Sequence, residues 1–364
     1  MGIKIGYDAK RFFNNPTGLG NYSRTLIHNL DLHATENQYS LFVHRKFHPE
    51  GYNKYRLIKG KGFVASLWRS RGIRQDIEAS DIQIFHGLSG ELPIKPDNKV
   101  KYVVTVHDLI FKLHPQWYTG IDRWFYSEKL RQALLKADAV VAISEQTASD
   151  IKEMYSIDEN KLHVIYQSWS STYDSIKEEE IHVPLLPKDY LLFVGSFYER
   201  KNLKNLIWAM SDKSCSDIPL VVVGNGKHRY KKMILELIQE LKLERQVLIL
   251  ENVYDALLKQ LYIRAKAVIY PSLYEGFGLP VLEAWKCGKP VITSDNSSLK
   301  EFGREACYLL EDPTNKEEMS EAISKFWTDT TYFNQLKSNI PAQLERFSPE
   351  KTANQLNDLY KSLL

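Results

Sequence analysis

Residues 270–283 read Tyr-Pro-Ser-Leu-Tyr-Glu-Gly-Phe-Gly-Leu-Pro-Val-Leu-Glu and carry the strongest structural signal in the chain. An apolar strand ends at Tyr270, a turn with two glycines follows, and Pro280 stands where the first helical residue is expected. Proline suits that position because its missing amide would have no partner within the helix. A strand that passes through such a turn into a helix is typical of α/β domains with parallel sheets, whose ligands bind beyond the carboxyl ends of the strands.

Short apolar runs alternate with segments of helical period on both sides of this stretch. In the first half they predict strands at Ile3–Tyr7, Ser40–Val43, Ile82–Phe85, Tyr102–Val106, Ala139–Ile143 and His163–Tyr166. In the second half they predict strands at Tyr190–Val194, Leu220–Val223, Val247–Leu250, Ala267–Tyr270, Pro290–Thr293 and Cys307–Leu309. Helices are expected between them, among others at Leu19–Leu32, Ile121–Lys136, Glu145–Tyr155, Leu203–Ser211, Arg229–Leu241, Ala256–Ala265 and Pro280–Cys287. This alternation predicts two parallel sheets, each covered by helices on both faces.

One segment breaks the alternation. Residues 172–189 contain three consecutive glutamates and two prolines with little periodicity, and we interpret them as a linker. The linker would join two Rossmann-like, doubly wound domains at residues 1–171 and 190–346 that face each other across a cleft. The last segment, residues 347–364, is expected to form a helix that packs back on the first domain.

The composition excludes several classes of protein. Hydrophobic residues make up 43% and charged residues 26% of the 364 residues, which excludes wholesale disorder. A net charge of +3 gives no general case for nucleic-acid binding. The three cysteines are too few and too scattered for a zinc site or a disulfide framework. Apolar runs are far shorter than the ~20 residues of a membrane helix, and a cleavable signal pattern is lacking, so we expect a cytoplasmic protein.

The turn before the Pro280 helix has the chemistry of a polar ligand site. Gly276 and Gly278 let the backbone approach a ligand closely. Free amides near Gly278 and Leu279, together with the positive end of the helix dipole, would bind an anion or a hydroxyl group. Glu275 precedes the turn and Glu283 lies one helical turn beyond it. The alternative is that both glutamates are solvated charges beside an ordinary helix start.

The string Glu-Gly-Phe-Gly-Leu-Pro-Val-Leu-Glu-Ala, which begins at Glu275, resembles the Glu-x7-Glu motif of the retaining, GT-B-fold glycosyltransferases of family 4. The resemblance covers nearly the whole chain. It implies that Glu275 contacts the donor sugar, that Glu283 hydrogen-bonds the ribose of the nucleotide, and that Phe277 and its neighbours line the donor. A carboxylate suits ribose because it can accept from two neighbouring hydroxyls. Retention of configuration is implied by the resemblance alone, and no protein general base is identified.

A second family-like segment, Phe-Val-Gly-Ser-Phe-Tyr-Glu-Arg-Lys-Asn-Leu, spans residues 193–203 after the first strand of the second half. Arg200 and Lys201 would clamp a diphosphate and stabilise the departing nucleotide, with Gly195 and Ser196 beside the donor. Taken alone, the two cations are equally well explained as a solvated basic turn. The commoner family pattern has an arginine where this chain has Ser196, which leaves the role of Arg200 open.

Two further segments resemble the family in the first half. The string Thr-Gly-Leu-Gly-Asn-Tyr-Ser at residues 17–23 is similar to the glycine loop that lies over the donor, which implies donor contacts for Gly18 and Gly20. Its alternative is a plain turn and helix cap. His107 directly follows a buried strand, and the resemblance implies a contact to the 6-position of the donor sugar. An isolated histidine here would be assigned a structural role.

Neither a metal nor another cofactor is expected. The sequence lacks an Asp-x-Asp pair and a His/Cys cluster with metal spacing, so positive side chains and a helix N-terminus would take the place of a divalent cation. Residues 45–74 carry nine basic side chains and one acidic one, Glu50, interleaved with Tyr52, Tyr55, Phe63 and Trp68. Such a surface can dock on anionic lipid head groups, which predicts peripheral contact with the inner face of the plasma membrane. A solvated face with some core aromatics is the alternative.

The expected function is transfer of a hexose from a nucleotide-diphosphate sugar to a glycan or polyprenyl-diphosphate-linked acceptor in surface-polysaccharide biosynthesis. Mannose from GDP-mannose is the first candidate because the Glu-Arg-Lys-Asn subgroup contains many mannosyltransferases, and a UDP-sugar stays open. One alternative is an NAD-dependent oxidoreductase, which calls for a glycine fingerprint directly after a strand and an acidic residue ~20 positions later. The other is a catalytically silent nucleotide-sugar-binding subunit, against which the intact Lys201, Glu275 and Glu283 argue.

Overall fold

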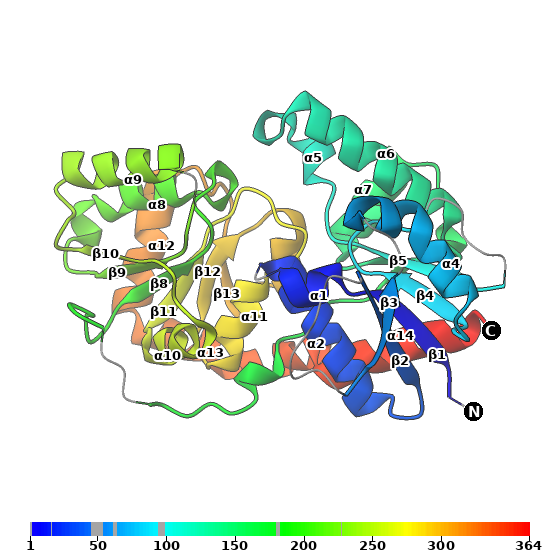
Figure 1. Ribbon diagram of the computed structural model, residues 1–364. Coiled ribbons are helices and arrows are strands. Elements are labelled where there is room, and N and C mark those ends of the chain that lie inside the picture. The colour runs from blue at the N-terminus through cyan, green and yellow to red at the C-terminus, as the bar shows by residue number, and fades with distance from the viewer. Residues whose placement is uncertain are drawn as a thin grey trace. The chain divides into compact units, whose positions relative to one another are not determined.

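The computed structural model describes residues 2–15, 17–44, 54–60, 64–93, 99–179, 183–226 and 228–364. The chain forms two compact units, coloured along the chain in Figure 1. Unit 1 comprises the residues up to Ser168 together with Phe347–Leu364, and unit 2 comprises Trp169–Arg346.

Unit 1 is built on a parallel sheet. Where the chain is described, it has seven strands in the order β3-β2-β1-β4-β5-β6-β7. The strands are β1 (Lys4–Asp8), β2 (Gln38–His44), β3 (Arg56–Gly60), β4 (Ile84–Gly87), β5 (Lys101–Val106), β6 (Ala139–Ala142) and β7 (Leu162–Val164). Its helices are α1 (Lys10–Asn14), α2 (Gly18–His33), α3 (Ala65–Leu67), α4 (Ile73–Glu78), α5 (Ile110–Leu113), α6 (Gly120–Lys136), α7 (Glu145–Met154) and α14 (Pro349–Ser362).

Unit 2 repeats the plan. Its described residues form six parallel strands in the order β10-β9-β8-β11-β12-β13. The strands are β8 (Leu191–Val194), β9 (Leu220–Val223), β10 (Val247–Leu250), β11 (Ala267–Tyr270), β12 (Val291–Ser294) and β13 (Cys307–Leu310). The helices are α8 (Leu203–Met210), α9 (His228–Glu240), α10 (Asp255–Arg264), α11 (Leu279–Lys286), α12 (Lys316–Thr328) and α13 (Thr330–Leu344). Numbered within the unit, this is the order 3-2-1-4-5-6 of the Rossmann fold, in which the ligand crevice lies where the order reverses.

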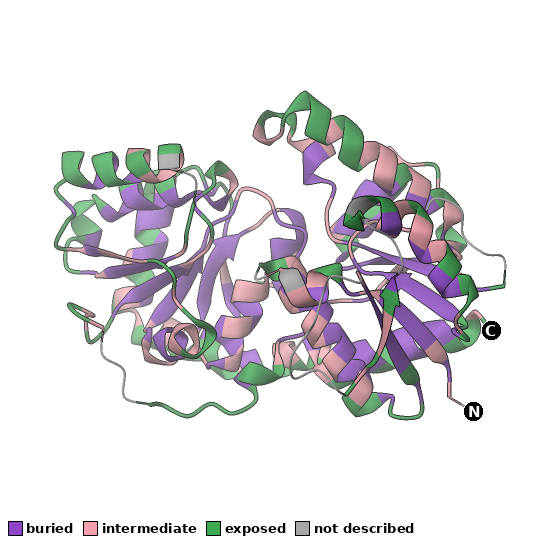
Figure 2. Ribbon diagram, viewed as in Figure 1, coloured by how far each residue is buried: buried purple, intermediate pink, exposed green. Residues whose placement is uncertain are grey.

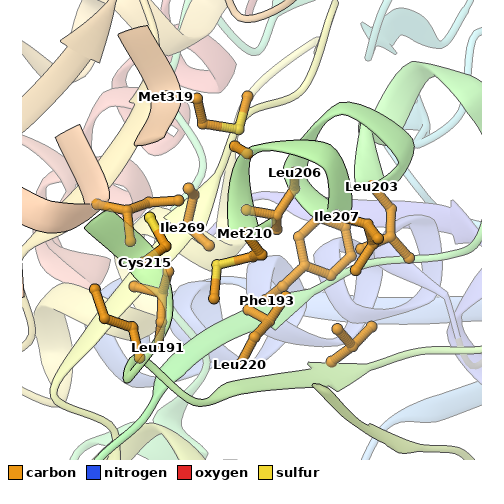
Figure 3. Close-up of a cluster of buried hydrophobic side chains, with 14 of the residues drawn as sticks. Leu191, Phe193, Leu203, Leu206, Ile207, Met210, Cys215, Leu220, Ile269 and Met319 are labelled. Atoms are coloured by element: carbon orange, nitrogen blue, oxygen red, sulfur yellow. The ribbon is translucent and has the colours of Figure 1, made fainter. Parts of the chain in front are cut away.

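The core of unit 2 follows directly from sequence periodicity. Helix α8 places apolar residues at positions 203, 206, 207 and 210, the spacing of one helix face, and all are buried. Figure 3 shows these side chains packed with Phe193 of β8 and Leu220 of β9. Most strands of both units are buried along most of their length, as Figure 2 shows, and β3, β7 and β10 are only partly buried. The α/β fold class predicted from the sequence is confirmed.

Helix α14 completes unit 1 by packing against α2. Ser348 caps its start by accepting from the amide of Lys351. The Asn37 side-chain amide donates to Oδ1 of Asn357 over 2.7 Å. The buried Tyr360 hydroxyl lies 2.6 Å from Nδ1 of His86, at the end of β4. Polar contacts inside the core thus hold the final helix in one register.

The segment interpreted as a separate linker is tied to unit 2 instead. The Trp169 indole donates to Oδ1 of Asp174 over 2.9 Å. The Gln260 side chain, from α10, donates to the carbonyl of Lys177 over 2.9 Å and accepts from the amide of Glu179 over 2.9 Å. Unit 2 therefore begins at Trp169, and it includes the described residues 169–179 and 183–189. The sequence showed a loss of periodicity here but not the side-chain contacts that anchor it.

Candidate functional site

The central feature of the site is the point in unit 2 where the strand order reverses. Strands β8 and β11 are direct neighbours there, and their carboxyl ends run into the two segments that the sequence singled out. The loop after β8 carries Arg200 and Lys201, and the loop after β11 carries Glu275. Because parallel strands end at the same edge, residues 74 and 75 positions apart in the chain meet in space.

Glu275 forms a buried ion triad with the two cations. Its Oε1 lies 2.5 Å from Nζ of Lys201 and its Oε2 lies 2.7 Å from Nη1 of Arg200. Lys201 and Glu275 are each only 8% exposed, and the Lys201 ammonium also donates to the Tyr270 hydroxyl. The triad brings together two predicted phosphate-binding residues and the predicted sugar-binding carboxylate, with a net charge of +1.

The protonation state of Glu275 follows from its neighbours. Burial raises the pKa of this carboxyl, but the positive charges of Arg200 and Lys201 outweigh burial and lower the pKa to about 2. Glu275 is therefore ionised at neutral pH. Each carboxylate oxygen accepts a charge-assisted hydrogen bond, so the group is held in one orientation.

The backbone that presents the cations is fixed by Asn202. This residue has a φ of +62°, a left-handed conformation that asparagine tolerates better than most residues. Its side-chain amide donates to the carbonyls of Pro271, over 3.0 Å, and Pro313, over 2.6 Å. The amide of Leu273 donates to the carbonyl of Arg200 over 2.8 Å. The loops after β8 and β11 are thus bonded to each other as well as to the triad.

Two serines after β12 shape the glycine turn. The Ser298 hydroxyl, which is buried, lies within hydrogen-bonding distance of the carbonyls of Glu275 (2.9 Å) and Phe277 (2.6 Å). The amide of Glu275 donates to Oγ of Ser297 over 3.1 Å. A Cβ at Gly278 would lie 2.8 Å from a ring carbon of Phe302, so only glycine fits there. Leu279 then begins α11.

Glu283 lies in α11 and has a different environment. The buried Tyr262, from α10, donates its hydroxyl to Oε2 of Glu283 over 2.9 Å. Burial raises the pKa of Glu283, and although the Tyr262 hydrogen bond opposes this effect, the pKa reaches about 7. The two glutamates of the motif therefore differ in pKa, because Glu275 has cationic partners and Glu283 has a neutral hydroxyl.

The remaining residues predicted in unit 2 line the same edge. A Cβ at Gly195 would lie 3.6 Å from Cδ of Lys201, so this glycine borders the lysine stem. Ser196 is exposed beside it. Sequence reasoning missed Tyr262, Tyr270 and Ser298, whose contacts to the motif carry no signal in the linear sequence.

His107 belongs to unit 1 and directly follows β5. Its Nε2 lies 2.8 Å from the carbonyl of Leu88, and its ring meets that of Tyr22 edge to face with 4.7 Å between centroids. Burial lowers the pKa of His107 to about 4, so the ring is neutral at pH 7. Because a carbonyl only accepts, Nε2 carries the proton and Nδ1 is the acceptor.

The segment predicted as the glycine loop of unit 1 forms the first turns of α2, and its two glycines have different structural demands. A Cβ at Gly20 would lie 1.7 Å from the carbonyl oxygen of Asn15, whereas a Cβ at Gly18 would meet nothing within 4 Å. Arg24 braces the loop by donating to the carbonyls of Phe12, over 2.9 Å, and Asn15, over 3.0 Å. The contact between the start of α2 and the segment before it requires Gly20 and does not require Gly18.

The structure changes the reading of the basic segment 45–74. Its residues 45–53 and 61–63, with Arg45, Lys46, Lys61, Tyr52 and Phe63, lie outside the described residues. Four described cations form ion pairs within unit 1, namely Lys54 with Asp31, Arg56 with Asp81, Arg69 with Asp8 and Arg74 with Glu78. Trp68 is buried rather than exposed, and its indole donates to Asp76 over 2.6 Å. Internal pairing reduces the charge that this segment offers to an anionic surface.

The described residues contain no group of three or more His, Cys, Asp or Glu side chains arranged to hold a metal ion. None of the helices in the described part of the chain combines the length and the apolar character needed to cross a membrane.

Both halves of the chain match known protein families. The family model of group 1 glycosyl transferases matches residues 175–343, and the model of glycosyltransferase family 4 matches residues 18–168. The O-antigen chain mannosyltransferase B of Escherichia coli is 28% identical, over 95% of this chain and 96% of that protein. Sucrose-phosphate synthase from Thermosynechococcus elongatus has a TM-score of 0.77 at 20% identity, over 99% of each chain. The Anabaena protein HepE, solved with UDP and glucose, has a TM-score of 0.73 at 17% identity, over 100% of each chain.

Proposed function

This chain belongs to the glycosyltransferases of the GT-B fold, and we propose that it transfers mannose from GDP-mannose to a lipid-linked glycan during surface-polysaccharide assembly. The single observation that carries the proposal is the ion triad of Arg200, Lys201 and Glu275 at the switch point of a Rossmann sheet. The O-antigen mannosyltransferase that aligns with 95% of the chain supports the sugar and the setting.

The triad supplies the electrostatics of the reaction. The acceptor oxygen forms a bond to the anomeric carbon of the donor while the bond from that carbon to the phosphate oxygen breaks and its electron pair leaves with the diphosphate. Arg200 and Lys201 would stabilise the negative charge that develops on that leaving group. Phosphate oxygens that engage the two cations would compete with Glu275, whose carboxylate then becomes available to the sugar hydroxyls.

The stereochemical course is proposed to be retaining, as the family resemblance implies. The acceptor hydroxyl would attack from the face that the diphosphate leaves, and its proton would pass to the departing phosphate oxygen. This route needs no protein base, and Glu275 is a poor one because its pKa is about 2.

Two other groups, Glu283 and His107, would orient the donor. Glu283 would accept from the ribose hydroxyls while Tyr262 occupies its Oε2. In unit 1, Nδ1 of His107 would accept from the 6-hydroxyl of the hexose, because the bond to Leu88 places the proton on Nε2. A donor that lacks the 6-hydroxyl would then gain nothing from His107. No metal or other cofactor is proposed.

The test is a thermal-shift panel of GDP-, UDP-, ADP- and dTDP-sugars and NAD(H), without added metal. A ligand at 100 times its Kd stabilises the folded state by about 2.7 kcal/mol, which such a measurement resolves. We expect selective stabilisation by GDP-mannose, followed by transfer to a lipid-linked glycan. Stabilisation by NAD(H) alone would support the oxidoreductase instead. Donor binding without transfer or donor hydrolysis would indicate a silent binding subunit.

A further inference from the structure

Five polar side chains form a continuous buried network inside unit 1. The Tyr360 hydroxyl of α14 lies 2.6 Å from Nδ1 of His86 in β4, and Nε2 of His86 lies 2.8 Å from Oγ1 of Thr105 in β5. Oγ1 of Thr105 lies 3.0 Å from the Tyr22 hydroxyl of α2, and the Tyr360 hydroxyl lies 3.2 Å from that of Tyr7 in β1. Tyr22 is 5% exposed and the other four are 0% exposed. The buried network thus links three strands to α2 and α14, which lie side by side in Figure 1.

The donors and acceptors of the buried network match one another. Burial lowers the pKa of His86 to about 3, so its ring is neutral and has one donor and one acceptor nitrogen. A hydroxyl stands at each nitrogen, and because a hydroxyl can both donate and accept, either tautomer of His86 is satisfied. A satisfied buried network holds its members in one arrangement, whereas apolar groups of the same shape can give nearly equal stability. The contribution of the network is therefore to orientation more than to stability.

The side chain that the buried network orients is His107. Tyr22 contacts both Thr105, through its hydroxyl, and His107, whose ring it meets edge to face with 4.7 Å between centroids. The backbone of His107 is held separately, since its carbonyl accepts from Oγ1 of Thr147 over 3.2 Å. The bond from Nε2 to the Leu88 carbonyl by itself would leave the imidazole free to tilt about that contact. Packing against the Tyr22 ring removes this freedom.

We propose that Tyr22 is a positioning residue for His107 and that the buried network extends this role to Tyr360 of the last helix. The hydroxyl of Tyr22, held by Thr105, fixes the plane of the Tyr22 ring, and that ring fixes the plane of the His107 imidazole. Nδ1 of His107 is thereby oriented before a donor binds. The orientation depends only on contacts within unit 1. Its effect on catalysis rests on the proposed function, in which Nδ1 accepts from the 6-hydroxyl of the hexose.

Nuclear magnetic resonance of the histidine ring protons tests the orientation without any reference to activity. The ring current of Tyr22 displaces the His107 signals, which are assigned by their absence in His107→Ala. We expect Thr105→Val and Tyr360→Phe to move these signals, because both variants break the buried network and leave the Tyr22 and His107 rings themselves unchanged. Thr105→Ser keeps the hydroxyl and should leave the signals near their wild-type positions.

Tyr39→Phe is the matched control for Tyr360→Phe. The Tyr39 hydroxyl is also buried in unit 1, where it lies 3.0 Å from the carbonyl of Leu30 and 2.9 Å from that of Ala34, outside the buried network. This control should lose similar stability and leave the His107 signals in place. Equal movement in Tyr39→Phe and Tyr360→Phe would show a general loosening of unit 1 and would overturn the proposal.

A double-mutant cycle tests the consequence for catalysis. With GDP-mannose as donor, Thr105→Val should lower kcat about fivefold while the donor KM changes less than about twofold, because a misaligned imidazole affects the reacting sugar more than the nucleotide. In the His107→Ala background the same substitution should leave kcat unchanged. An equal loss of kcat in both backgrounds would show a structural role for Thr105 and would overturn the proposal. If Thr105→Val does not fold, Tyr22→Phe takes its place in both measurements, because it removes only the hydroxyl at the end of the network.

The two measurements separate this inference from the proposed function. His107 signals that move in Thr105→Val, in a protein whose wild type transfers no mannose, would contradict the proposed function and leave the positioning role of Tyr22 standing. Signals that stay in place in Thr105→Val would overturn that role even in an active enzyme. Signals that move in Thr105→Val and not in Tyr360→Phe would overturn its extension to the last helix.

Discussion

The Tyr262 hydroxyl lies 2.9 Å from Oε2 of Glu283 and joins α10 to α11 through a hydrogen bond between a buried tyrosine and a partly buried glutamate. The Tyr262 ring in turn meets that of Tyr173 at 75° with 6.1 Å between centroids. A carboxylate on a helix surface has several rotamers, and this bond selects one of them. Glu283 is thereby oriented before any ligand arrives, which lowers the entropy cost of binding.

Removing that hydroxyl should weaken donor binding with little effect on turnover. In Tyr262→Phe we expect the donor KM to rise about three- to tenfold with kcat nearly unchanged, because the lost bond orients a group that contacts the nucleotide rather than the reacting atoms. Tyr190→Phe is the matched control, since the buried Tyr190 hydroxyl donates over 2.8 Å to the carbonyl of Leu261, also in α10. Both variants should lose similar stability. A donor KM that rises equally in both would show that α10 as a whole has shifted.

Replacing Glu275 should separate turnover from binding. Glu275→Gln is expected to lower kcat about 100-fold or more, because it removes a charge from the reacting centre. Nucleotide affinity should stay the same or increase, since Arg200 and Lys201 are released for the diphosphate. The free energy of unfolding should fall by about 3–5 kcal/mol, because the buried ammonium of Lys201 loses its anionic partner. Steady-state kinetics measure kcat, and calorimetric titration with GDP measures nucleotide affinity. Glu199→Gln, at an exposed residue next to Arg200, is the control. Loss of GDP binding together with kcat would contradict this assignment.

The pKa of Glu283 predicts a specific dependence of stability on pH. Because its pKa in the folded protein, about 7, lies above the ordinary value of 4.5, folding favours the protonated form. The resulting stability is fully present below pH 4.5 and is lost as the pH rises through 7, by on the order of 2–3 kcal/mol. Glu283→Gln does not titrate. Chemical denaturation of both proteins from pH 4.5 to 8 should show wild-type stability falling relative to the variant, and parallel curves would contradict the raised pKa.

The glycine loop of unit 1 provides a matched pair of substitutions. Gly20→Ala should destabilise the protein by about 1–3 kcal/mol, because its methyl group would overlap the Asn15 carbonyl oxygen. Gly18 is a helical residue, and an added methyl group there would point into open space. The melting temperature of Gly18→Ala should therefore equal or exceed that of the wild type. Lower activity in a stable Gly18→Ala would locate a ligand beside that residue. Full activity in Gly18→Ala would contradict the donor contact predicted for it.

Activity should survive removal of divalent cations. The positive charge that a metal would provide to a departing diphosphate is present in Arg200 and Lys201. Transfer rates measured in excess EDTA should therefore equal those measured with Mg²⁺ or Mn²⁺. Complete loss in EDTA that either ion restores would show that the proposed electrostatics are insufficient.

Most of the fold was predictable because buried parallel strands are short apolar runs that stand out in the sequence. Strand β3 (Arg56–Gly60) was missed, since in the described part of the sheet it lies at the edge beside β2 and its two apolar residues, Leu57 and Ile58, stand between Arg56 and Lys59. Edge strands commonly carry such charges, which protect them from further pairing. Sequence periodicity reports burial, and this strand is only partly buried.

The site was predictable only where a motif spans it. Residues 275–283 identified both glutamates, but their opposite pKa shifts depend on partners outside the motif. The contact between His86 and Tyr360 joins residues 274 positions apart, and the left-handed φ of Asn202 has no signature of its own. Such contacts arise when residues far apart in the sequence pack together, and local sequence patterns do not predict them.

The return of the chain to unit 1 at Phe347 has a consequence for synthesis of the protein. The ribosome delivers β1 to β7 first, all of unit 2 next, and α14 afterwards. Until α14 emerges, the residues of α2 that pack against it are uncovered and His86 lacks the Tyr360 hydroxyl. A nascent chain therefore completes unit 2 while unit 1 is still open, and the unit begun first is finished last.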